Sequence, residues 1–157
     1  GGTKILAGGQ TVRTGDRVII VDGGEASWQC CSTAEALAAQ GKKVEIITSQ
    51  YYVGLDIPTF SQRPLYERLA RAGVVLTPLT DVKEVREGTL VCVKRFTGEE
   101  TVKPVDTIVA SMGNRANDAL HKSLKGVVAE LYLAGDCLAP RKASEAIREG
   151  HLAARQL

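Results

Sequence analysis

Apolar residues in this chain gather in short β-rich runs that alternate with longer segments of helical spacing. Residues 18–21 are all β-branched, which is typical of a strand buried on both faces of a parallel sheet. Helical spacing over residues 28–40 ends at Gly41, and a second apolar run covers residues 44–48. A strand, a glycine-rich turn, a helix and a second strand in this order predict a right-handed βαβ unit.

The pattern continues with a second helix and a third parallel strand. Helical spacing over residues 61–72 places Pro64 in the first turn and Gly73 at the end, and the apolar residues 74–76 follow as a strand. The segment 51–59 contains aromatic residues, a glycine and a proline. We expect it to be a loop over the edge of the sheet.

From residue 81 to residue 103 the pattern changes to short β-rich runs separated by Glu87-Gly88 and Thr97-Gly98. Such spacing is typical of antiparallel hairpins. Residues 106–110 then return to the buried parallel type. The whole order predicts an α/β fold, a three-layer Rossmann-like parallel sheet with an inserted antiparallel β-meander.

The two ends of the chain differ from this middle part. Residues 1–16 are rich in Gly and Thr and are predicted to be a linker or tail. Residues 131–134 predict a strand that runs into Gly135-Asp136 and then a helix over residues 143–157. A strand that ends in this way puts a carboxylate at the carboxyl edge of a sheet, where nucleotide hydroxyls bind in open α/β folds.

Composition and charge limit the classes of binding partner that the sequence indicates. The 157-residue chain carries a net charge of +2, and its basic residues are scattered. Neither a nucleic acid nor an anionic membrane surface is therefore indicated. No apolar run approaches the roughly 20 residues of a membrane span, so we expect a cytoplasmic protein. Because the chain begins with Gly-Gly rather than Met, we also expect it to be a piece of a longer one.

The cysteines give no metal-ligand spacing. Cys30 and Cys31 are adjacent, Cys92 and Cys137 stand alone, and no C-x-x-C pair occurs. We expect reduced thiols and no metal site. His121 and His151 lack a partner at a triad-like spacing, so no catalytic residue is assigned.

The turn after the first strand is the first candidate site. A G-x-G-x-x-G motif would place glycines where this sequence has Asp22, Gly24 and Ser27, so only the middle glycine is kept. Asp22 stands beside a helix N-terminus, where its carboxylate either takes the place of a phosphate or repels it. Nucleotide binding and a purely structural turn both remain open. The candidate binding residues here are Gly23, Gly24, Glu25, Ala26 and Ser27.

The ends of two further strands contribute candidate residues to the same site. Thr48 and Ser49 end the second strand, and with Gln50 they offer neither the acidic residue typical of NAD sites nor the arginine typical of NADP sites. Gly113 and Asn114 follow the strand 106–110. They either approach a bound nucleotide or form a tight turn that leaves the sheet.

A family resemblance covers residues 17–157. The strings VIIVDGGEASW, EALAAQGKKVEIIT, DTIVASMGNRAN and LYLAGDCLAPRKASEAIREGHLAAR carry it. Together they resemble the C-terminal half of the NADH:flavin oxidoreductases of the 2,4-dienoyl-CoA reductase, enoate reductase and trimethylamine dehydrogenase group. The strand-Gly-Asp and Ala-Pro-Arg block is the most specific part.

The resemblance implies a division of labour between parts of a larger enzyme. Residues 17–117 correspond to an inserted NAD(P)-type Rossmann-like domain, and residues 118–157 to the returning segment of an FAD-type domain. Gly135 and Asp136 would then contact FAD, while FMN and a 4Fe–4S cluster would belong to parts outside this chain. The resemblance thus implies a nucleotide-binding fragment of a flavin-dependent NAD(P)H oxidoreductase that reduces an unsaturated substrate, the fragment itself being inactive. The alternative is a degenerate, non-binding scaffold that docks the other domains.

Overall fold

A computed structural model describes residues 3–7, 10–25 and 27–156. These residues form two compact units, Gly1–Gly113 and Asn114–Leu157, which are described separately below. The division falls close to the predicted boundary after Asn117. No helix within the described residues is long and apolar enough to cross a membrane.

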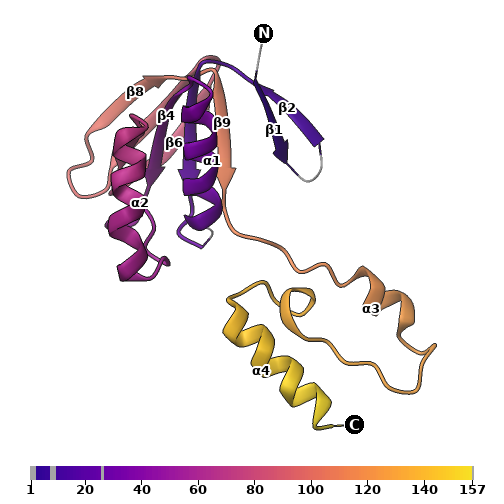
Figure 1. Ribbon diagram of the computed structural model, residues 1–157. Coiled ribbons are helices and arrows are strands. Elements are labelled where there is room, and N and C mark those ends of the chain that lie inside the picture. The colour runs from indigo at the N-terminus through magenta and orange to yellow at the C-terminus, as the bar shows by residue number, and fades with distance from the viewer. Residues whose placement is uncertain (1–2, 8–9, 26, 157) are drawn as a thin grey trace. The chain divides into compact units, whose positions relative to one another are not determined.

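A four-stranded parallel sheet forms the centre of the first unit (Figure 1). Its strands lie in the order β5-β4-β3-β9. Their bounds are β3 (Arg17–Asp22), β4 (Lys43–Thr48), β5 (Val75–Thr77) and β9 (Thr107–Ser111). Val18 pairs with Val44 on one side and with Thr107 on the other, which confirms the predicted βαβ unit.

Two helices, α1 (Ser27–Ala39) and α2 (Thr59–Arg71), cover one face of this sheet (Figure 1). Val18 and Ile20 of β3 pack there with Leu37 and Leu65 of the helices, and all four are buried. The helix α2 begins before the predicted start, so Pro64 lies inside it rather than in the first turn. Its missing N–H costs the helix one backbone hydrogen bond.

The predicted meander forms a separate antiparallel sheet on the opposite face. It consists of β6 (Thr80–Arg86), β7 (Thr89–Lys94) and β8 (Glu100–Pro104), in the order β6-β7-β8. Ile19 and Ile47 of the parallel sheet pack against Leu90, Cys92 and Val105. Helices, parallel sheet and meander thus make the three layers that the sequence predicts, with the meander inserted between β5 and β9 in chain order.

The segment predicted to be a linker or tail contains two strands among its described residues. Strands β1 (Thr3–Ala7) and β2 (Gln10–Thr14) pair as an antiparallel hairpin. Ile5 stands opposite Val12 in this register. Three scattered apolar residues are too few to give a strand pattern in the sequence, although the threonines among them favour extended backbone.

The second unit contains helices joined by irregular backbone. Its elements are α3 (Ala119–Leu124), the short 3₁₀ helix η1 (Gly135–Cys137) and α4 (Ala143–Ala154). The strand predicted at residues 131–134 is wrong, because this segment has no strand partner among the described residues 114–156. A lone extended segment has no neighbour for its backbone groups, so it is not a strand. The helix predicted after Lys142 is confirmed, and it ends at Ala154.

Candidate functional site

The carboxyl ends of three parallel strands meet at the glycine-rich turn. The N–H of Gly23, after β3, donates a hydrogen bond to the carbonyl of Ser111 at the end of β9 (2.8 Å). A Cβ at Gly23 would lie 3.2 Å from the Cα of Met112, and a Cβ at Gly113 would lie 2.9 Å from a carboxylate oxygen of Glu25. The β3 and β9 turns therefore pack closely, and at Gly113 the φ of +87° favours glycine as well.

The end of β4 is tied to the same turn. The hydroxyl of Thr48 donates to the carbonyl of Asp22 (3.0 Å) and accepts the N–H of Gln50 (3.3 Å). Gly24 has a φ of +85°, and the nearest atoms to a Cβ there would belong to the flexible side chain of Gln50, at 3.0 Å. The left-handed backbone therefore favours glycine at this position.

The structure thus brings together most of the predicted residues of the first unit. Gly23, Gly24, Glu25, Thr48 and Gly113 lie at one edge of the sheet through the contacts above. Ser27 begins α1 and Ser49 follows β4 at the same edge. Ala26 lies outside the described residues.

Asp22 is the unusual member of this turn. Its side chain is 2 % exposed, and its carboxylate accepts the N–H of Gly24 (3.0 Å) and the hydroxyl of Ser27 (3.4 Å). Burial raises the pKa of Asp22 and nearby Asp56 adds to this, while the two hydrogen bonds oppose the shift. The carboxylate therefore takes one turn N–H that a phosphate would use in a dinucleotide site.

Three residues near the turn were not predicted from the sequence. Gln50 lies against Gly24, Met112 lies against Gly23, and a guanidinium N–H of Arg95 donates to the carbonyl of Ser49 (3.0 Å). Arg95 is 46 residues from Ser49 in the chain. No local motif indicates the contact between Arg95 and Ser49. Gln50 could have been included among the candidate residues, because it directly follows Ser49.

Gly135 and Asp136 belong to the second unit and are held by its own contacts. Gly135 has a φ of +69°, and its N–H donates to the carboxylate of Glu149 (2.8 Å). Asp136 lies in η1 and is exposed. Asn114, the first residue of this unit, is exposed as well.

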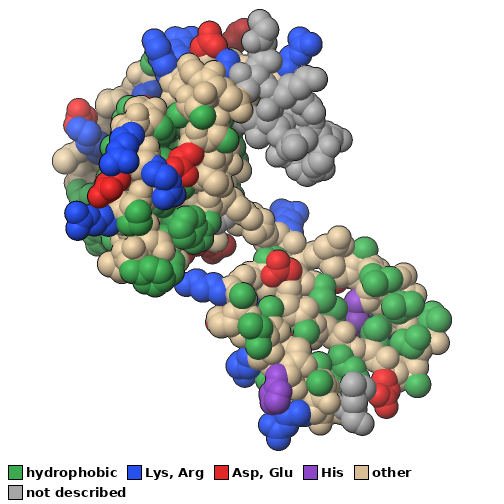
Figure 2. All heavy atoms as spheres, viewed as in Figure 1, with side chains coloured by type: hydrophobic (Ala, Val, Ile, Leu, Met, Phe, Trp, Pro, Cys, Tyr) green, Lys and Arg blue, Asp and Glu red, His purple; other side chains and the backbone are tan. Residues whose placement is uncertain are grey.

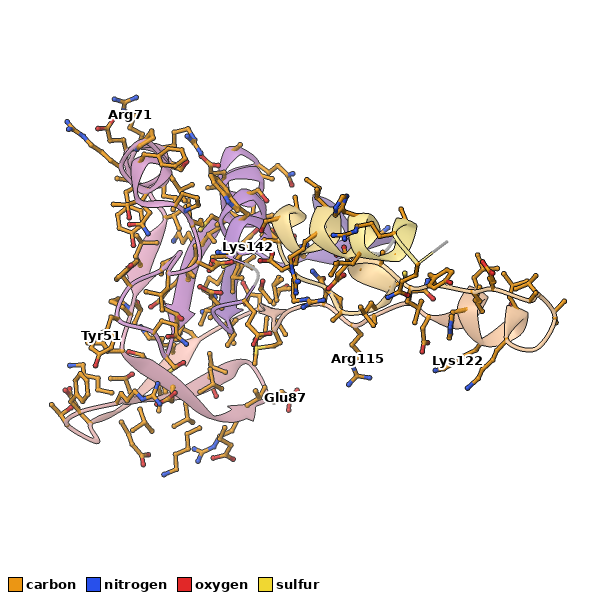
Figure 3. The ribbon with its side chains drawn as sticks, turned by 90° about the horizontal axis from the view of Figure 1, so that it is seen from below. Tyr51, Arg71, Glu87, Arg115, Lys122 and Lys142 are labelled. Carbon is orange, nitrogen blue, oxygen red and sulfur yellow. The ribbon has the colours of Figure 1, made fainter. Side chains whose placement is uncertain are left out.

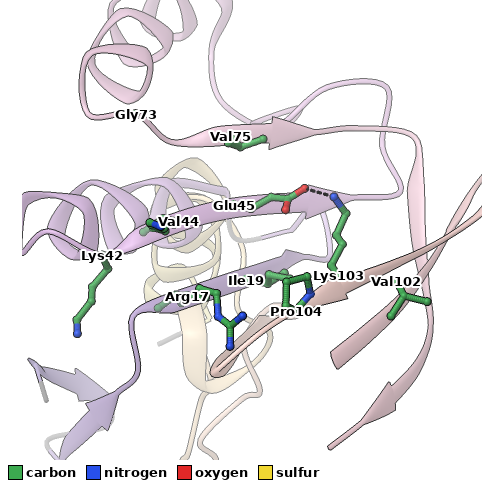
Figure 4. Close-up of a pocket in the computed structure, with 12 residues that line it drawn as sticks. Arg17, Ile19, Lys42, Val44, Glu45, Gly73, Val75, Val102, Lys103 and Pro104 are labelled. Carbon is green, nitrogen blue, oxygen red and sulfur yellow. Dashed lines mark ion pairs between the residues drawn. The ribbon is translucent and has the colours of Figure 1, made fainter. Parts of the chain in front are cut away.

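A cavity of about 480 Å³ opens at the other edge of the parallel sheet, where β3 and β4 begin (Figure 4). Arg17 and Lys43 line it from the first residues of these strands. Inside the cavity, the carboxylate of Glu45 forms an ion pair with the ammonium group of Lys103 (2.8 Å). The cavity therefore lies at the amino edge and is separate from the glycine-rich turn.

The cysteines and the metal-binding side chain types were a further part of the sequence prediction. Cys30, Cys31, Cys92 and Cys137 are free thiols, and no group of three metal-binding side chains occurs in the part of the chain that the structure describes. On the face that Figure 2 shows, basic and acidic side chains of the first unit are interspersed.

Comparisons with known proteins place this geometry in context. No family model matches the chain. A metal reductase of Desulforamulus reducens is 32 % identical over 117 residues, which cover 73 % of this chain and 17 % of the reductase. The chain thus spans less than a fifth of the length of this curated relative.

Solved structures give the same picture. Histamine dehydrogenase from Rhizobium sp. 4-9 matches with a TM-score of 0.80 and 25 % identity, over 92 % of this chain and 23 % of the enzyme. A complex of 2-naphthoyl-CoA reductase with 2-naphthoyl-CoA matches with a TM-score of 0.80 and 26 % identity, over 93 % of this chain and 22 % of the reductase. The resemblance predicted from the sequence is therefore confirmed: the chain is similar to the Rossmann-type region of flavin and iron–sulfur oxidoreductases of the 2,4-dienoyl-CoA reductase, enoate reductase and trimethylamine dehydrogenase group.

Proposed function

We propose that this chain is the nucleotide-binding part of a flavin-dependent NAD(P)H oxidoreductase resembling 2,4-dienoyl-CoA reductase. The parent enzyme passes reducing equivalents from NAD(P)H through flavin to an unsaturated substrate. The turn 22–27 binds the pyrophosphate of NAD(P)H, and Asp136 contacts FAD. FMN and a 4Fe–4S cluster belong to other parts of the parent.

The single observation that carries this proposal is the position of Gly24. It lies at the carboxyl edge of β3, in the turn between β3 and α1, with a left-handed backbone and the side chain of Gln50 beside it. The first N–H groups of a helix have no partner inside the helix and attract anions. We infer that a pyrophosphate binds to these groups beside Gly24. The two acidic residues of the turn, Asp22 and Glu25, weaken its binding, and Asp22 already accepts the N–H of Gly24.

The residues of this chain bind and orient a cofactor, and they supply no chemical step. Hydride transfer is the chemistry of the nicotinamide and flavin themselves. The hydroxyl of Ser27 donates to the buried carboxylate of Asp22 (3.4 Å), and we assign this pair to the structure of the turn rather than to catalysis. The chain alone is therefore expected to bind NAD(P)H without turning it over.

Titration of the full chain with NADH, NADPH and ADP tests the proposal. We expect amide NMR shifts at Gly23, Gly24 and Ser27 at millimolar ligand, and none at Gly88 in the distant β6–β7 turn. Absence of shifts at the glycine-rich turn rejects the binding claim. Glu25→Gln should tighten binding about 3- to 10-fold by removing one negative charge near the phosphates, whereas Glu87→Gln, the matched control, should leave it unchanged.

A second candidate function is a non-binding scaffold that docks the domains of the parent. The hydrogen bonds from Gly24 and Ser27 to Asp22 favour it, because they satisfy the turn without any ligand. The double variant Asp22→Gly, Ser27→Gly restores both missing motif glycines. If only the repaired chain binds ADP, the natural turn is a scaffold; if both bind, the first proposal stands.

A further inference from the structure

The end of β4 is the part of the candidate site that selects between cofactors. In a βαβ dinucleotide unit the second strand ends beside the adenine ribose, where an acidic side chain binds the 2′-hydroxyl and an arginine accommodates a 2′-phosphate. Here the second strand is β4, followed by Ser49 and Gln50. Neither can repel a phosphate, because both side chains are neutral.

An arginine reaches this strand end from the meander layer. The Nη1 group of Arg95 donates to the carbonyl of Ser49 (3.0 Å), and the side chain is half exposed. A guanidinium has five N–H donors in a planar fork that matches phosphate oxygens. No described residue accepts a hydrogen bond from Nη2 of Arg95, so the two N–H groups of Nη2 are available to a ligand.

Backbone hydrogen bonds hold Arg95 in this place. The N–H of Leu79 donates to the carbonyl of Gln50 (3.0 Å), and the N–H of Arg95 donates to the carbonyl of Leu79 (2.8 Å). The main chain of Arg95 is thus linked through one residue to the end of β4. The backbone of Arg95 is therefore held near the end of β4, and its guanidinium reaches Ser49 through the hydrogen bond from Nη1.

Two exposed aromatic rings flank the arginine. Tyr51 follows Gln50, Phe96 follows Arg95, and the ring centroids lie 6.4 Å apart (Figure 3 labels Tyr51). Their exposed fractions are 70 % and 72 %, in a chain with only one Trp, four Tyr and two Phe. An exposed aromatic pair beside a cation offers a flat apolar surface on which a purine base can stack.

We propose that the cofactor of this site is NADPH, with Arg95 as the ligand of the 2′-phosphate and Tyr51 as the ring that stacks on adenine. The proposal rests on the proposed function, because it assumes that the glycine-rich turn holds the pyrophosphate. Asp81 is the opposing charge, since its carboxylate lies 4.0 Å from Nε of Arg95. It lowers the affinity for a phosphate, while Nη2 of Arg95 has no described acceptor.

Calorimetric titration of the full chain with NADPH, NADH, 2′,5′-ADP and 5′-ADP tests this assignment. We expect NADPH and 2′,5′-ADP to bind about 10- to 100-fold more tightly than their partners without the 2′-phosphate, as a charge-assisted fork implies. Arg95→Ala should remove this ratio and leave the NADH affinity unchanged. Arg95→Lys, which keeps the charge but loses the fork, should keep part of the ratio.

The controls separate this inference from the proposed function. Arg86→Ala removes an equally exposed arginine at the other end of the meander and should change nothing, while Asp81→Asn should strengthen NADPH binding. Equal binding of NADPH and NADH overturns the inference and leaves the proposed function standing. A preference that survives in Arg95→Ala overturns the role of Arg95. Failure of all four ligands to bind overturns the proposed function, and the inference with it.

Discussion

The two units of this chain are stabilised by different interactions. The first unit has apolar clusters on both faces of its parallel sheet, with Ile20 and Leu37 on one face and Ile19 and Leu90 on the other. In the second unit none of the described residues 114–156 is buried, and apolar side chains are spread over its surface in Figure 2. Within this unit the carboxylate of Glu149 accepts hydrogen bonds from both Gly135 and Arg141.

This difference separates the two candidate nucleotide contacts. The glycine-rich turn follows β3, a strand whose two faces are both covered, so the strand end from which Gly23 and Gly24 extend is fixed by packing. Asp136 stands in a segment with no covered apolar surface, so its geometry depends on a few hydrogen bonds. The geometry of a binding site depends on the packing beneath it. At the glycine-rich turn the described residues of the first unit supply this packing.

Separating the units should have the largest effect. We expect residues 1–113 to fold alone with a cooperative urea transition, because both apolar clusters lie inside them. Residues 114–157 should give the circular dichroism of an unfolded chain, because a short segment without a buried core does not offset its loss of conformational entropy. A cooperative transition in the isolated residues 114–157 would contradict the comparison.

Matched isoleucine truncations should have the next largest effect. Ile20 is fully buried, and we expect Ile20→Ala to lower the free energy of unfolding by about 2–5 kcal/mol through the lost burial and the cavity. Ile147 in α4 is 73 % exposed, and Ile147→Ala should change the free energy of unfolding by less than about 0.5 kcal/mol. Urea unfolding of the full chain measures both, and similar costs would mean that α4 is covered in solution.

The sequence predicts the first unit well for the same reason that this unit is stable. Continuous β-branched runs and helical spacing reflect burial, so β3, α1 and β4 could be placed from local pattern alone. Residues 131–134 are as apolar as a strand, but the prediction was wrong because a strand also needs a neighbour. The pattern of apolar residues shows which face of an element is apolar, but it does not show whether another element covers that face.

The candidate site was predictable only as far as it is local. The glycines after β3 and β9 could be found from their positions at strand ends, and the structure brings them together. The contact of Arg95 with Ser49 could not, because it joins two layers across 46 residues. The hydrogen bonds from Gly24 and Ser27 to Asp22 could not be predicted either. The sequence left open whether the carboxylate of Asp22 takes the place of a phosphate or repels it.

Removing Glu149 should have a smaller and local effect. Glu149→Ala deletes the acceptor of the Gly135 N–H, and a hydrogen bond of this kind contributes about 0.5–1.5 kcal/mol. We therefore expect hydrogen exchange at Gly135 to become about 2- to 10-fold faster, with no change in the strands of the first unit. Glu145→Ala is the control, since that carboxylate accepts from Ser144 instead. Equal acceleration in both variants would show that polar contacts do not hold η1.

The smallest effect should come from a surface ion pair, and its pH dependence distinguishes the units. Arg17 lowers the pKa of Asp106 from 3.8 to about 2, first through its side-chain hydrogen bonds and then through its N–H. A lowered pKa stabilises the fold above the ordinary pKa of Asp, and this contribution disappears as the pH falls through about 2. We therefore expect Asp106→Asn to weaken the first unit at pH 7 and to match the unchanged chain near pH 2.

Asp118 provides the matched test in the second unit. Lys122 lowers its pKa as well, through a side-chain hydrogen bond one helical turn away. The sign of the pH dependence is the same, but α3 contains no buried residue, so this pair supports no cooperative core. Asp118→Asn should therefore leave the urea midpoint of the chain unchanged at every pH, while Asp106→Asn lowers it at neutral pH. A common shift for both variants would mean that the two units unfold as one.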